Sequence, residues 1–287
     1  MQITTASAKG VGDENEDGVF TGPGSVVVLD GLSAPKDLPM ACSHGTPWLV
    51  RQLGTRLVAL MGDDDRPLAE ALRTAIEDVN AMHSGTCALD QEAVPAATVV
   101  MLRQRQSVLD YLVLSDSVLV LDTAGTVKAV ADTSVEDVAG EEMAAALAGP
   151  AGTPERAARV SELVAVQRSL RNSPGGYWVA STNPAAADHA ITGSVPAAEV
   201  RRAALLSDGA SRLADTFHQL SWEELLDVLD GAGPAALISK TRSAEASDAD
   251  GTRWARFKVS DDATAAYVTF DDARHTQSSS AEHDRVG

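Results

Sequence analysis

One short apolar run that ends in an acid and a glycine constrains the fold most. Residues 25–29 are Ser-Val-Val-Val-Leu, and Asp30-Gly31 follows them directly. An apolar run without polar alternation is typical of a strand that is covered on both faces. A carboxylate at the end of such a strand is costly unless a partner compensates its charge. The pattern recurs where Ala204-Leu205-Leu206 leads into Ser207-Asp208-Gly209, so we expect two carboxylates at one edge of a sheet core.

Hydrophobic periodicity predicts two groups of strands with helices between them. Leucines at helical spacing predict paired helices over residues 49–60 and 68–79, and residues 133–175 read as further helix. A short helix over 234–242 and a mobile loop over 243–256 follow. Short apolar runs predict strands at 2–8, 18–21, 26–29, 98–102, 108–114, 118–122, 127–130, 202–207 and 263–270. We expect the four strands between 98 and 130 to form an antiparallel meander. This order predicts an α+β fold with two packed antiparallel sheets that are covered by helices.

The chain shows no internal repeat and no linker rich in proline and serine, which favours one domain. We expect this domain to span residues 1–271. Residues 272–287 are polar and poor in apolar side chains, a composition that is typical of a disordered tail.

Charge and cysteine content exclude several classes of function. Asp and Glu outnumber Lys and Arg by 41 to 23, giving a formal charge of −18, which argues against binding nucleic acid. No apolar run approaches the ~20 residues of a membrane span, and the polar start predicts no signal peptide. Cys42 and Cys87 lack CxxC spacing and the six histidines lack ligand spacing, so we expect neither a zinc site nor redox work. A cytoplasmic protein with no membrane partner is the resulting expectation.

Four acidic residues share one context, the end or the beginning of an apolar strand: Asp30, Asp116, Asp208 and Asp261. Strand ends on one side of a sheet sandwich converge, and clustered carboxylates stay ionised only with cations between them. Oxygen ligands without His or Cys suit Mg²⁺ or Mn²⁺. Two such ions would orient a phosphate and activate a water. The alternative is a set of unrelated surface turns, in which Asp is common.

The order of the motifs resembles the metal-dependent protein phosphatases of type 2C. The likeness runs from about residue 5 to residue 270 and implies a four-layer α-β-β-α sandwich of two antiparallel sheets flanked by paired helices. It rests on six motifs: Asn15-Glu16-Asp17, Val28-Leu29-Asp30-Gly31, Ala97-Thr98, Ser115-Asp116-Ser117, Leu206-Ser207-Asp208-Gly209 and Asp261-Asp262-Ala263-Thr264.

The resemblance implies two bound Mn²⁺ or Mg²⁺ ions, with a third at a further site. Asp30 would bridge the two ions and the Gly31 carbonyl would bind one of them. Asp208 and Asp261 would ligate the second ion, so Asp30, Asp208 and Asp261 would carry the catalysis. Asp116, shared with Asp208, would hold the third ion.

The positions around these ligands both follow and depart from the family's pattern. Glu16 and Asp17 would hold metal-bound waters, as residues behind a ligand shell do. Gly12 stands where the family has an arginine that grips phosphate. Asp262 replaces the usual asparagine and adds negative charge, and Leu32 leaves no histidine general acid at that point.

These features predict a phosphatase that hydrolyses phosphoserine and phosphothreonine in proteins. Gly12 motivates two alternatives. One is a catalytically impaired metal-binding pseudophosphatase that acts as a regulatory interaction module. The other is a phosphatase for a small phosphorylated metabolite, so the expected substrate is a phosphoprotein or a small phosphoester.

Overall fold

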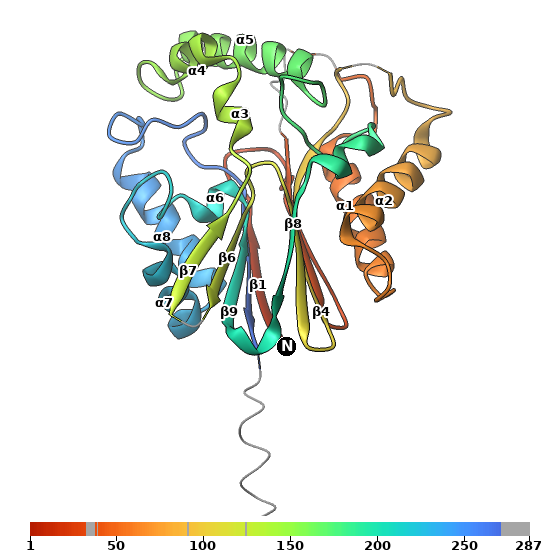
Figure 1. The fold of residues 1–287 in the computed structure, drawn as a ribbon. Helices are drawn as coiled ribbons and strands as arrows, with labels where there is room; N and C mark the ends of the chain where they lie inside the picture. The colour runs from red at the N-terminus through yellow and green to blue at the C-terminus, as the bar shows by residue number, and fades with distance from the viewer. Residues whose placement is uncertain (33–37, 39, 91, 124, 271–287) are drawn as a thin grey trace, which may run out of the picture.

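Two antiparallel sheets of five strands each form the centre of the molecule (Figure 1). The computed structural model describes residues 1–32, 38, 40–90, 92–123 and 125–270. The expected disordered tail at 272–287 lies outside these residues. No helix in the described part of the chain is long and apolar enough to cross a membrane.

The first sheet has the order β1-β10-β9-β6-β7 and the second has the order β2-β3-β4-β5-β8. All neighbouring strands are antiparallel. The strands of the first sheet are β1 (Gln2–Ala8), β6 (Val118–Thr123), β7 (Thr126–Val130), β9 (Val200–Leu206) and β10 (Ala263–Thr269). Those of the second are β2 (Gly18–Gly22), β3 (Ser25–Gly31), β4 (Ala97–Arg105), β5 (Val108–Leu114) and β8 (Ile191–Pro196).

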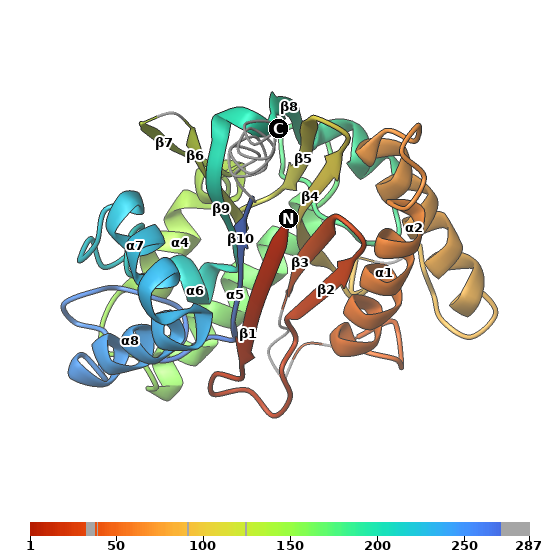
Figure 2. The same ribbon diagram turned by 90° about the horizontal axis from the view of Figure 1, so that it is seen from below.

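Helices cover the outer face of each sheet, which confirms the layered α+β fold predicted from the sequence (Figure 2). On the second sheet lie α1 (Thr46–Leu60) and α2 (Leu68–His83), with the 3₁₀ helix η1 (Pro184–His189) beside α2. On the first sheet lie α6 (Asp208–Ser211), α7 (Trp222–Ala232) and α8 (Pro234–Ser247). The remaining helices are α3 (Ser134–Asp137), α4 (Gly140–Leu147), α5 (Pro154–Leu170) and η2 (Ala197–Glu199). Both α4 and α5 lie across one end of the sandwich (Figure 1).

Alternation along β3 explains why its apolar run is unbroken. Val26 and Val28 point between the sheets, whereas Val27 and Leu29 pack under α1 and α2. All four side chains are fully buried, as expected for a strand covered on both faces.

The expected meander between residues 98 and 130 is wrong. β4 pairs with β5 in the second sheet, but β6 and β7 belong to the first. The chain changes sheets at Ser115-Asp116-Ser117, where Ser115 has a left-handed φ of 69°. Periodicity shows which face of a strand is buried but not which sheet the strand joins, so the pattern hid this crossover.

The mobile loop expected at 243–256 is also wrong in its first part, because α8 continues to Ser247. The segment that follows is held by a buried ion pair, in which Arg256 Nη1 lies 2.7 Å from Asp248 Oδ2. Backbone N–H groups of Arg253 and Trp254 also donate to Asp248. These contacts order the turn that leads into Asp261.

Candidate metal centre

Strand register brings the acidic motifs to one end of the sandwich. Leu206 of β9 pairs with both Val118 of β6 and Ala265 of β10. Asp208 and Asp116 therefore lie two residues beyond this level, and Asp262 lies three residues before Ala265. In the second sheet Asp30 pairs with Thr98 of β4. The Thr98 hydroxyl lies 2.5 Å from that of Ser117, which joins the two sheets at this end.

Asp30 is the centre of the acidic group. Its Oδ2 accepts a 3.1 Å hydrogen bond from the backbone N–H of Asp208. Burial raises the pKa of Asp30 well above its usual range, and four neighbouring carboxylates add to the effect: Asp17, Asp208, Asp261 and Asp116. Like charges this close disfavour simultaneous ionisation. The charges of the other three predicted acidic ligands, Asp116, Asp208 and Asp261, thus all act on Asp30, which no single motif could show.

Asp208 carries the same electrostatic signature. Burial, followed by the charge of Asp261, raises the pKa of Asp208 to about 7, against an opposing effect of Arg212. Asp116 lies on the side of the group that faces α3. Burial raises its pKa, as do the charges of Glu136 and Asp132, while a 3.2 Å hydrogen bond from the Ser115 hydroxyl opposes the change.

The carboxylate of Asp17 is buried without a compensating cation or hydrogen-bond donor among the described residues. Both of its carboxylate oxygens are buried and have no hydrogen-bond partner among the described residues. Burial raises the pKa of Asp17 to about 7; the hydroxyls of Ser207 and Thr264 lie near enough to lower it in part, without satisfying either oxygen. An orphaned buried carboxylate is destabilising unless a cation or a water meets it. This observation fits a divalent ion or its bound water at this position.

Glycines let the backbone close tightly around the acids. A Cβ on Gly31 would lie 2.4 Å from the carbonyl oxygen of Glu16, and one on Gly209 would lie 1.9 Å from that of Asp262. Real Cβ atoms do not approach so closely, so both positions need glycine. The glycines of the two Asp-Gly pairs therefore allow close backbone packing at this edge, in addition to allowing the chain to turn.

Asp262 acts as an anchor for the segment between β1 and β2. Its Oδ1 accepts a 2.7 Å hydrogen bond from the N–H of Gly10, and its Oδ2 accepts one of 2.7 Å from the N–H of Glu16. A carboxylate offers two acceptor atoms where the family's asparagine offers one. The substitution at Asp262 thus fixes the loop that carries Glu16 and Asp17.

Asp261 differs from the other acids because two cations already contact it. Lys258 Nζ lies 2.5 Å from Oδ1, and Arg212 Nη2 lies 3.1 Å from Oδ2. Arg212 also contacts Glu245 at 2.7 Å and is almost fully buried. Although burial lowers the pKa of Lys258, the charge of Asp261 raises it above its usual range. The sequence pattern did not reveal Arg212 as a partner, since 49 residues separate it from Asp261, whereas Lys258 is only three residues away.

The oxygen donors at this edge fit hard divalent ions. Asp30 with the Gly31 carbonyl, Asp116 and Asp208 provide donors from three segments, and Asp17 provides a further unsatisfied carboxylate from a fourth. Gly12 is exposed and carries no cation, as the sequence indicated. Residues 33–37, which follow Leu32, lie outside the described residues.

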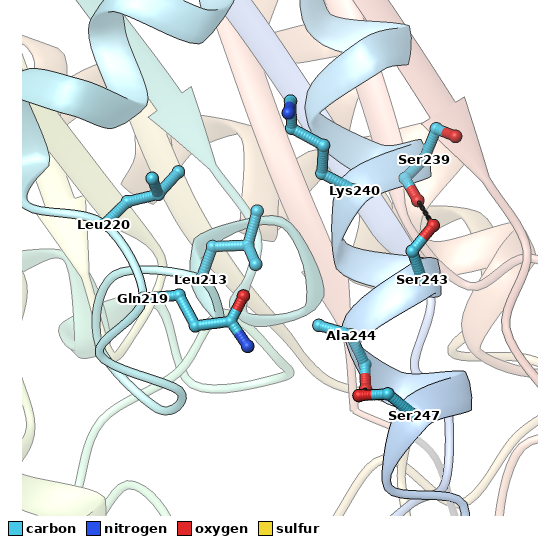
Figure 3. Close-up of a pocket in the computed structure, with 8 residues that line it drawn as sticks. All are labelled: Leu213, Gln219, Leu220, Ser239, Lys240, Ser243, Ala244 and Ser247. Carbon is cyan, nitrogen blue, oxygen red and sulfur yellow. Dashed lines mark hydrogen bonds between the residues drawn. The ribbon is translucent and has the colours of Figure 1, made fainter.

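A hollow of about 510 Å³ lies away from the acids, between α8 and the loop before α7 (Figure 3). Lys240 is the one charged residue in its lining, and the hydroxyl of Ser243 donates to the carbonyl of Ser239 at 2.9 Å. No carboxylate lines it. This hollow adds nothing to the chemistry of the acidic edge.

The sequence reading missed a second cluster of ligand-type side chains. Cys42, His44, His83 and Cys87 offer ligand atoms that all lie within 4.8 Å of one another, a grouping that the expectation of no zinc site did not anticipate. The signal is present as a C-x-H pair and an H-x₃-C pair, but the two pairs are far apart and neither has CxxC spacing.

Comparison with known proteins supports the architecture. No family model matches the sequence, and no curated protein matches it. Solved structures do match. The catalytic domain of the serine/threonine phosphatase PstP, in complex with two manganese ions, superposes with a TM-score of 0.56 at 19% identity, covering 94% of this chain and 98% of that one. The fold is that of the metal-dependent serine/threonine phosphatases.

Two further structures give the same result. PstP/Ppp of Mycobacterium tuberculosis matches with a TM-score of 0.55 at 16% identity, covering 94% of this chain and 99% of that chain. The phosphatase Stp1 of Staphylococcus aureus matches with a TM-score of 0.56 at 12% identity, covering 94% and 95%. The phosphatase fold predicted from six short motifs is confirmed.

Proposed function

We propose that this protein is a metal-dependent phosphatase that hydrolyses phosphoserine and phosphothreonine in proteins. The observation that carries the proposal is the group of carboxylates around Asp30, drawn from both sheets, whose charges add to the effect of burial in raising the pKa of Asp30. Such a group is typical of a site built for cations rather than of unrelated surface turns. The phosphatase fold of the solved structures is consistent with this use.

Asp30, the Gly31 carbonyl, Asp208 and Asp116 would hold the ions, together with Asp261. When bound, two Mn²⁺ or Mg²⁺ ions would orient the phosphate and lower the pKa of a water that attacks phosphorus. The protein's own contribution is to hold the acids in place. Asp262 does so for the loop with Asp17, and the glycines do so for the strand ends.

Lys258 supplies positive charge that Gly12 does not. Its side chain is 35% exposed, whereas that of Arg212 is 6% exposed. A phosphate that approaches the acidic edge therefore reaches the ammonium of Lys258 more easily than the guanidinium of Arg212. Lys258 would bind the phosphate as a point charge, without the bidentate geometry of an arginine.

The test is a phosphatase assay on the full chain with an aryl phosphate and a phosphothreonine peptide, with and without Mn²⁺. We expect turnover that requires Mn²⁺ and that falls at least ~100-fold in Asp30→Asn, because the neutral amide cannot replace a carboxylate between two ions. Asp78→Asn, on the exposed face of α2, is the control and should keep activity. Equal turnover of wild type and Asp30→Asn would refute the assignment.

The ion pairs of Asp261 favour a second candidate, a pseudophosphatase that works as an interaction module. Two cations occupy the oxygens of one expected ligand, which weakens its competition for metal. This candidate predicts Mn²⁺ binding without turnover of either phosphoester. Activity on the aryl phosphate but not on the peptide would instead indicate a small phosphorylated metabolite as substrate.

A further inference from the structure

A compact group of two cysteines and two histidines lies between the segment before α1 and the end of α2. Cys42 Sγ lies 3.5 Å from His44 Nδ1 and 3.4 Å from His83 Nδ1. Cys87 Sγ lies 3.3 Å from His44 Nδ1 and 3.3 Å from Cys42 Sγ. Four soft or borderline ligand atoms thus point at one common space, although they come from segments about 40 residues apart in the sequence.

These four separations are close to edges of a tetrahedron around zinc, and the four ligand atoms all lie within 4.8 Å of one another. Zn–S bonds of about 2.3 Å and Zn–N bonds of about 2.0–2.1 Å give S···N edges of about 3.6 Å and an S···S edge of about 3.8 Å at tetrahedral angles. Each observed S···N distance is within about 0.3 Å of this value, and the two sulfur atoms need to separate by about 0.5 Å. Small movements of surface segments would therefore complete the geometry.

The surroundings position the ligands without metal. The ring of His44 packs against Trp48 at 4.4 Å between centroids, and the ring of His83 packs against Trp48 at 4.8 Å. The N–H of Cys87 donates to the carbonyl of His83 at 3.0 Å, which turns the chain back toward the helix. Cys42 and His83 are buried, whereas His44 is exposed and leaves a route for an ion to enter.

We propose that Cys42, His44, His83 and Cys87 bind one structural Zn²⁺ ion. Four protein ligands fill a tetrahedral zinc and leave no position for substrate, which is the pattern of structural sites. The ion would tie the segment that follows β3 and Gly31 to the end of α2, on the helical layer that covers the second sheet. This site shares no residue with the acidic edge and differs from it in metal preference. Its sulfur and nitrogen ligands select zinc, whereas the carboxylates suit Mg²⁺ or Mn²⁺.

A disulfide between Cys42 and Cys87 is the competing use of the same residues. Both cysteines are free thiols, and their sulfur atoms are 3.3 Å apart, beyond the roughly 2.05 Å of a bond. Two histidines have no role in a disulfide, so their convergence on the sulfur atoms favours a metal. The experiment below distinguishes the two.

The test uses the full chain, purified without chelator and under reducing conditions, with metal content measured by mass spectrometry. We expect about one Zn²⁺ per chain, lost in Cys42→Ser and in His83→Ala. The ion should remain in Asp30→Asn, which changes the acidic centre, and in His189→Ala, a control that removes an exposed histidine stacked on Trp178.

Co²⁺ substitution in wild-type protein provides a second readout that needs no variant to fold. Tetrahedral ligation by two thiolates should give intense visible absorption and a sulfur-to-cobalt charge-transfer band, and Zn²⁺ should abolish both. Zn²⁺ should also protect the two thiols from alkylation. Wild-type protein that binds no Zn²⁺ and gives no such cobalt bands, or that contains a Cys42–Cys87 disulfide under reducing conditions, would overturn the proposal.

Discussion

Replacing Lys258 by methionine tests how the cation beside Asp261 acts. Lys258 Nζ and Asp261 Oδ1 are 2.5 Å apart, and the carboxylate side chain is 13% exposed. Any metal that uses this oxygen must first displace the ammonium. Methionine keeps the length of the side chain and removes its charge, so Lys258→Met frees the oxygen with little change in packing.

The expected gain in metal affinity follows from the strength of this contact. A hydrogen bond between charged groups contributes about 1.5–3 kcal/mol, and the 35% exposure of the Lys258 side chain places the value in the lower part, about 1.5–2 kcal/mol. At about 1.4 kcal/mol per factor of ten, Mn²⁺ should bind roughly 10- to 30-fold more tightly to the variant. Arg212 still contacts the other oxygen, which keeps Asp261 in place.

Isothermal titration with Mn²⁺, on protein whose zinc content is held constant, measures this change. Lys240→Met is the matched control, since Lys240 lines the hollow shown in Figure 3 and not the acidic edge. Lys258→Met should also raise the KM for an aryl phosphate, because Lys258 supplies the accessible positive charge. Unchanged or weaker Mn²⁺ binding in Lys258→Met would refute the idea that this lysine competes with metal.

Two further predictions concern stability. The pKa of Asp17 and that of Asp208 are raised from 3.8 to about 7. A raised pKa in the folded state contributes to the free energy of unfolding below pH 3.8, and this stabilisation is lost as the pH rises through 7. The Tm of protein held in chelator should therefore fall between pH 5 and pH 8, with a smaller fall after Mn²⁺ is added; a Tm that rises over this range in chelator would contradict the reasoning. Arg256→Met leaves Asp248 as an uncompensated buried charge and should reduce the free energy of unfolding by about 3–5 kcal/mol in urea denaturation. The exposed Arg253→Met, which loses only a cation–π contact with Trp254, should cost less than about 1 kcal/mol, and equal losses in the two variants would argue against the buried pair.

Local patterns predicted the parts of the fold that depend on local physics. The β-branched run of β3 and the leucine faces of α1 and α2 are each set by burial of neighbouring residues, so periodicity identified them. A further local device is the capping box that begins α7, in which the Ser221 hydroxyl accepts from the N–H of Glu224. The crossover at Asp116 depends on pairing with β9 some 80 residues later, which no local window contains.

The candidate site shows the same division. Asp30 and Asp208 were identifiable because each closely follows an apolar run, where an ionised side chain is costly without a partner. The contact of Arg212 with Asp261 and the anchoring role of Asp262 were not identifiable, because these partners lie far apart in the sequence. The Cys and His ligands were missed for that reason as well, since two unrelated segments each contribute half of the group.

The pairing of β1 with β10 has a consequence for synthesis of the chain. Gln2 lies opposite Thr269, and among the described strands β1 pairs only with β10. During translation β1 therefore stays an unpaired edge until residues 263–269 have left the ribosome. Edges of this kind are prone to mispairing, and such long-range closure slows folding. Asp261 and Asp262 are made more than 230 residues after Asp30, so the acidic edge is completed only after two distant parts of the chain have both been synthesised.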